Sequence, residues 1–163
     1  MPTKNSPVAL VTRILEEYAE KAVFRGFSVH PKTGGKAAYK MVWHYDRPFE
    51  LLLDAPKRTL RFPAVLPGVP ARSAMYRDLR AFLNERHSAE VPEHRRVNPV
   101  KARVTLSNKM GVVSLTLGVK DDDFEYATRK IIQIVHEIFL VFLVDGPYYE
   151  YMVEQIGLDP DRF

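Results

Sequence analysis

The sequence predicts a single α+β domain, in which an antiparallel sheet of about five to six strands carries helices packed on one face. Residues 23–66 and 100–119 are rich in alternating, β-branched and aromatic residues, which is typical of strands. Three other long segments repeat their apolar residues at helical spacing. With 163 residues, 46% of them hydrophobic, the chain suits one domain over residues 1–163.

The first half of the chain predicts one helix followed by three or four strands. Ser6 is a predicted N-cap, with Pro7 at the first helical position. Beyond Lys21, AVFRGFSVH and AAYKMVWHYD form a predicted hairpin around the turn HPKTGGK. FELLLD continues as a strand, and TLRFPAV is a further strand that the prolines at 63, 67 and 70 end.

The second half predicts a helix, a hairpin and two more helices. ARSAMYRDLRAFLNERH is amphipathic at helical spacing, and residues 87–99 form a predicted loop. Val100, Ala102, Val104 and Leu106 then alternate with polar residues, and VVSLTLGV returns after NKMG, so this hairpin should have one buried and one wet face. Three aspartates at 121–123 cap a long helix that ends at Asp145, and a short helix ends at Gly157. The predicted order is α-β-β-β-(β)-α-β-β-α-α.

Composition excludes several classes of protein. The chain has no cysteine, so disulfides, thiolate nucleophiles and cysteine-based zinc sites are absent, and a cytoplasmic location is favoured. The start MPTKNSPVAL lacks the apolar region of a signal peptide, and the longest apolar stretch is too short for a membrane span, so no membrane insertion is expected. The net charge of +4 is a mild excess that names no partner.

No motif indicates a catalytic site, a bound metal or a cofactor. His136 and Glu137 resemble the start of the zinc motif H-E-x-x-H, but Leu140 stands where the second histidine is needed. The glycines of TGGK lie between two strands and serve a turn, whereas a phosphate loop must lead into a helix. We therefore expect no catalytic residue, no metal and no cofactor.

Two aromatic or basic surfaces could bind a partner. Tyr39, Met41, Trp43 and Tyr45 share one face of a strand, and packing inside the sheet is their simplest role. A basic strip lies between residues 86 and 103, with Glu90 and Glu93 as its acidic residues. The strip is a candidate site for an anion or a nucleic acid, although a solvated loop is the simpler interpretation. Its candidate anion-binding residues are Arg86, Arg95, Arg96, Lys101 and Arg103.

The long helix has an apolar end that nothing in its own pattern covers. On a helical wheel, Ile131, Ile134, Val135 and Ile138 face the sheet, while Gln133 and His136 lie opposite. Apolar residues continue that opposite side in the last two turns, so either the short final helix or a second subunit should cover them. The candidate partner or dimer interface comprises Leu140, Leu143, Val144, Tyr148, Tyr149 and Tyr151.

The order of elements and a few short motifs resemble the YbjN family of sensory transduction regulators. These motifs are Phe82 to Arg86 at the end of the middle helix, Arg96-Val97, the alternating hairpin, and Glu137-Ile138-Phe139 in the long helix. The resemblance implies a fold similar to that of type III secretion chaperones, which usually dimerise. It also implies a small cytoplasmic binding or chaperone-like protein without known catalytic residues.

Three functions follow from these observations. The first is a non-enzymatic protein-interaction module, chaperone-like or regulatory, which acts as a homodimer and binds an unidentified protein. The second is an anion or nucleic-acid binder that uses residues 86–103. The third is an enzyme whose site is assembled from dispersed residues such as His44, Asp46 and His136.

Overall fold

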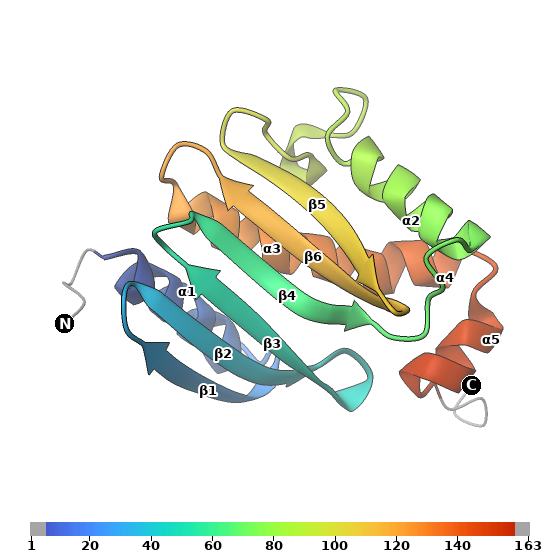
Figure 1. Ribbon diagram of the computed structural model, residues 1–163, viewed down its shortest axis with the longest axis horizontal. Coiled ribbons are helices and arrows are strands. Elements are labelled where there is room, and N and C mark those ends of the chain that lie inside the picture. The colour runs from blue at the N-terminus through green and yellow to red at the C-terminus, as the bar shows by residue number, and fades with distance from the viewer. Residues whose placement is uncertain (1–5, 159–163) are drawn as a thin grey trace.

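One six-stranded antiparallel sheet forms the centre of the structure (Figure 1). The computed structural model describes residues 6–158, so the first and last five residues of the predicted domain lie outside it. The strand order is β1-β2-β3-β4-β6-β5, and every neighbouring pair runs antiparallel. The strands are β1 (Arg25–Lys32), β2 (Lys36–Trp43), β3 (Arg47–Asp54), β4 (Thr59–Leu66), β5 (Ala102–Lys109) and β6 (Val112–Val119). The predicted α+β class and sheet are confirmed.

The helices follow the predicted order along the chain. They are α1 (Pro7–Glu20), α2 (Ala74–Glu85), α3 (Phe124–Glu137), α4 (Leu143–Asp145) and α5 (Tyr149–Tyr151). A π-helical turn joins α3 to α4 (η3, Ile138–Phe142), another follows α5 (η4, Met152–Ile156), and two 3-10 turns lie in connections (η1, His44–Asp46; η2, Glu93–Arg95). As predicted, side chains cap the helix starts, since Ser6 accepts from the Ala9 amide and Asp123 from the Tyr126 amide.

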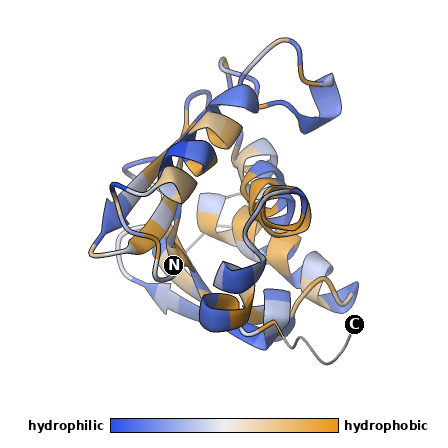
Figure 2. Cartoon of the chain, turned by 90° about the vertical axis from the view of Figure 1, so that its right-hand side faces the viewer, coloured by the Kyte–Doolittle hydropathy of each residue, from blue (hydrophilic) through white to orange (hydrophobic). Residues whose placement is uncertain are grey.

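Two helices cover one face of the sheet. Helices α1 and α3 pack on each other and on the strands, and the layers are visible edge-on in Figure 2. The apolar stripe of α1 and the sheet-facing side of α3 are buried, as the helical wheel predicted. The strands contribute their alternate residues to the same core. Tyr39, Leu51, Phe62 and Leu115 are among its fully buried side chains.

The other face of the sheet is open, and Figure 1 looks onto it. Lys40, Arg61 and Thr105 are exposed there because they alternate with core residues along their strands. The predicted division of the second hairpin into one buried and one wet face therefore extends across the sheet.

Helix α2 protects the outer edge of β5 (Figure 1). The edge amide of Val104 donates to the His87 Nε2 atom at 3.4 Å. The opposite ring nitrogen, Nδ1, lies 3.1 Å from the Leu83 carbonyl and donates to it in the tautomer that leaves Nε2 free to accept. A histidine at the end of α2 thus takes the place of a neighbouring strand.

Three details of the sheet differ from the predictions. Tyr45 does not share the buried face of Tyr39, Met41 and Trp43, because the chain turns at η1 with a positive φ of 57° at Tyr45. Val100 precedes β5 and is 71% exposed, so it does not belong to the alternating strand. Pro63 lies inside β4, where the pairing with β6 shifts register between Phe62 and Leu66 instead of ending.

The two faces predict opposite responses to truncation at neighbouring positions. Replacing the fully buried Leu115 by Ala should lower the free energy of unfolding by about 2–5 kcal/mol, because it leaves a cavity in the core. Replacing Thr116, on the open face, by Ala should cost less than about 1 kcal/mol. Urea titration of both variants measures the difference, and equal losses would contradict the two-layer arrangement.

Candidate functional site

Apolar side chains remain exposed along the last turns of the long helix. His136, Leu140 and Val144 occupy successive turns on its outer side, and Leu140 and Val144 are 51% and 57% exposed. We call Leu140 and Val144 the apolar stripe. It runs from the π turn η3 into α4. A π turn inside a helix is an irregularity that is frequent at functional sites.

The C-terminal segment leaves the apolar stripe uncovered. Met152 and Ile156 are buried, and the Tyr151 hydroxyl donates to the Pro67 carbonyl at 2.6 Å. The segment therefore packs at the connection between β4 and α2. Of the two predicted covers for the helix end, the short final helix does not cover Leu140 and Val144.

Half of the predicted interface residues take part in the packing of the chain itself. Leu143 is only 1% exposed, so its prediction as an interface residue is wrong. The Tyr148 ring stacks on Phe142, and its hydroxyl donates to Asp78 at 2.8 Å. Burial and the Asp78 carboxylate raise the pKa of Tyr148 to about 12. Together with Tyr151, these side chains hold the C-terminal segment in place, whereas Tyr149 is 56% exposed.

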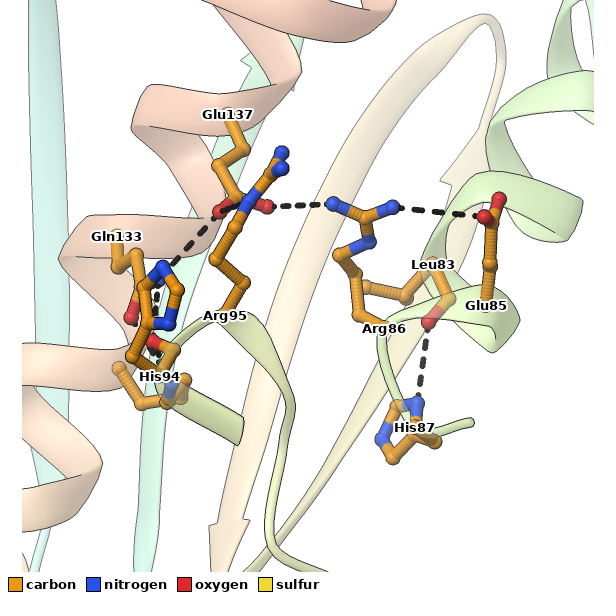
Figure 3. A network of polar contacts seen from close by, with 9 residues as sticks. Leu83, Glu85, Arg86, His87, His94, Arg95, Gln133 and Glu137 are labelled. Carbon is orange, nitrogen blue, oxygen red and sulfur yellow. Dashed lines mark hydrogen bonds and ion pairs between the residues drawn. The ribbon is translucent and has the colours of Figure 1, made fainter. Parts of the chain in front are cut away.

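A buried carboxylate at the C-terminal end of α3 binds two arginines from other segments. Glu137 is 8% exposed, and its oxygens lie 2.9 Å from the Arg86 guanidinium and 3.3 Å from the Arg95 Nε atom. Gln133 also donates to this carboxylate at 3.4 Å. Figure 3 shows both guanidinium groups reaching Glu137. Glu137 therefore points inward, whereas His136 beside it is exposed.

The basic strip is not a continuous surface for an anionic partner. Arg86 is 6% exposed and is held by Glu137 and the Phe82 ring, so its prediction as an anion-binding residue is wrong. Arg95 shares Glu137, and Lys101 lies 2.7 Å from the Asp123 carboxylate.

The two remaining members of the strip lie apart in the fold. Arg103 points to the open face of β5, and Arg96 belongs to the loop before it. The strip therefore separates into an internal ion network, an ion-paired lysine and two arginines that lie on different segments.

The structure brings together two of the three residues named for a dispersed enzyme site. The imidazoles of His44 and His136 lie 5.2 Å apart between ring centroids, and His44 stacks on Phe139 at 4.5 Å. Burial lowers the pKa of His44 to about 4, and the neighbouring charge of His136 acts in the same direction. Asp46 instead forms an exposed ion pair with Arg25 at 3.0 Å.

The described part of the chain contains neither a metal-binding cluster nor a membrane-spanning helix. Within residues 6–158, no three His, Cys, Asp or Glu side chains gather closely enough to hold a metal ion. None of the helices in that range is both long enough and apolar enough to cross a bilayer.

Comparisons with protein-family models, with curated proteins and with solved structures find no match to this chain.

The ion network predicts a large effect of a single neutralisation. Glu137→Gln should lower the free energy of unfolding by about 3–5 kcal/mol, because the buried Arg86 loses its partner charge. His136→Gln, at the exposed neighbouring position, should change it by less than about 0.5 kcal/mol. Chemical denaturation of the two variants measures the contrast, and a small effect of Glu137→Gln would show that the network does not hold the fold.

The environment of His44 predicts an acid-sensitive fold. Its pKa is about 4 in the folded chain against 6.5 for an ordinary histidine, so between these values the unfolded chain binds the extra proton. Stability should therefore fall as the pH drops from 6.5 to about 4. His44→Phe keeps an aromatic ring against Phe139 and should flatten this slope, whereas His30→Gln, at an exposed site, should leave it unchanged. Melting temperatures across this pH range test the prediction.

Proposed function

We propose that the chain is a non-enzymatic protein-interaction module, chaperone-like or regulatory, that acts as a homodimer in the cytoplasm. The observation that carries the proposal is the apolar stripe, Leu140 and Val144, which remains exposed after the C-terminal segment has packed elsewhere. Exposed apolar groups on a helix that is otherwise well buried are typical of contact surfaces.

A second copy of the chain is the occupant that suits this surface best. Residues 140, 141 and 144 carry no charge, and the nearby Glu137 is turned inward to its arginines. A neutral face meets its own copy without like-charge repulsion, whereas a charged face favours a partner of opposite charge. Two copies related by a two-fold axis would place each Leu140 against Val144 of the partner subunit.

The contact must include more surface than the apolar stripe alone. A stable interface buries about 800 Å² on each partner, which is more than two side chains provide. Tyr45, which packs beside Phe139, and Tyr149 are both partly exposed and could extend the contact. Aromatic residues of this kind are enriched at interfaces because their rings are large and rigid.

The resemblance to the YbjN family supports the same proposal. That resemblance implies a dimeric binding protein and a fold similar to that of type III secretion chaperones. An unidentified protein would then bind to the assembled dimer. The ion pairing of Arg86, Arg95 and Lys101 makes a nucleic acid the less favoured partner.

Oligomeric state gives the direct test. The wild-type chain should have twice the 18.7 kDa mass of one copy in light scattering coupled to size exclusion at micromolar concentration. Leu140→Asp should reduce the mass to that of one copy, because it places a charge in the apolar contact. Met110→Asp, at a side chain that is 95% exposed on the β5–β6 turn, should leave the mass unchanged.

Circular dichroism would show that Leu140→Asp keeps the fold of one copy, as expected at an exposed position. A wild-type chain that stays at the mass of one copy would refute the homodimer.

A further inference from the structure

A second surface feature lies on α3, against the loop that precedes β5. There a hollow of about 490 Å³ is lined by polar and cationic side chains, among them His94, Arg96, Asn98, Lys101, Tyr126 and Lys130. We call it the Lys130 pocket. Its volume is within the range of sites for small molecules.

Lys130 is a buried cation without a carboxylate at ion-pair distance among the described residues. It is only 6% exposed, and its ammonium donates to the Gln133 side chain at 2.9 Å and to the His94 carbonyl at 3.5 Å. Burial lowers its pKa, and the negative charge of Glu137 partly opposes this effect. An ammonium buried in this way is destabilising unless an anion compensates its charge.

Arg96 contributes a second cation with unused donors. Its Nε atom is buried and finds no acceptor within residues 6–158. A guanidinium offers five N–H donors in a planar fork, which suits oxyanions. The pocket thus combines a buried ammonium with an unsatisfied guanidinium.

The remaining walls compensate these two cations only in part. The charge of Lys101 is already offset by Asp121 and Asp123 at 3.3 and 2.7 Å, and Glu93 is the acidic residue that lines the hollow. The Tyr126 ring also lines the hollow, and its centroid is 5.6 Å from the Lys101 ammonium and 5.5 Å from that of Lys130. This ring offers an apolar wall to the uncharged part of a ligand.

We propose that the Lys130 pocket binds a small phosphomonoester, with Lys130 and Arg96 holding its phosphate group. A phosphate monoester carries a charge of about −1.5 to −2 at neutral pH, which matches two cations better than a single carboxylate does. The pocket is larger than inorganic phosphate requires, so an organic group fits beside the phosphate.

This site is separate from the proposed dimer contact. The Lys130 pocket involves the first half of α3 and residues 93–101, whereas the apolar stripe lies beyond residue 138. Failure of one proposal therefore leaves the other standing.

Isothermal titration calorimetry with glycerol 3-phosphate, inorganic phosphate and glycerol tests the site. The full-length protein should bind glycerol 3-phosphate and not glycerol. Lys130→Met keeps the length of the side chain and should weaken binding at least tenfold, as should Arg96→Gln, because each removes a charged donor. Lys109→Met, at an exposed lysine at the opposite end of β5, should change the affinity less than twofold.

The outcomes separate the sources of the phosphate group. Tighter binding of glycerol 3-phosphate than of inorganic phosphate supports an organic ligand, and equal affinity supports a phosphate site that ignores the organic part. No binding of either compound at millimolar concentration would overturn the proposal, as would unchanged affinity in both variants. If Lys130→Met does not fold, Arg96→Gln carries the test, because Arg96 is less deeply buried.

Discussion

The carboxylate of Glu137 is the constraint on which the second half of the structure depends. A charge at this depth is stable only with partners, and the chain supplies Arg86 from the end of α2 and Arg95 from η2. The three groups join segments that are 42 and 51 residues apart in sequence. Helix α2, the loop before β5 and α3 are thereby held to one another, and two arginines that look like surface charge in the sequence are used for this purpose.

Sequence patterns predicted the fold well where the responsible forces are local. Alternation along β5 and β6, the caps Ser6 and Asp123, and the stop at Gly157 depend on neighbours a few residues away. The pairing of β4 with β6 and the place of β5 at the edge depend on contacts across the chain, which periodicity does not encode. The prediction that Tyr45 shares the buried face was wrong for a related reason. Its turn conformation ends the strand, although the alternating pattern continues in the sequence.

The candidate sites were harder to predict because polar residues were assigned to the surface. Arg86 and Glu137 are both buried, and a helical wheel cannot show that partners distant in sequence compensate their charges. Leu140 and Val144 were predicted to need a cover because the apolar pattern continued around the helix, and both are exposed in the single copy. Leu143 was placed with them, although it lies on the buried side one residue away. The continuous helical segment of α3, η3 and α4 consequently presents two chemically different surfaces, a cationic one on α3 and an apolar one on η3 and α4.

Because α2 covers β5, the two edges of the sheet differ in how readily they accept an additional strand. At this edge the Val104 amide already has an acceptor in His87, so an incoming strand cannot use that donor. At the opposite edge, β1 is the outermost strand among residues 6–158, and it carries Arg25, Pro31 and Lys32. Charges and a proline on an exposed edge strand discourage edge-to-edge pairing with the strand of another molecule. Amyloid-like growth is thus opposed by a helix on one side and by sequence chemistry on the other.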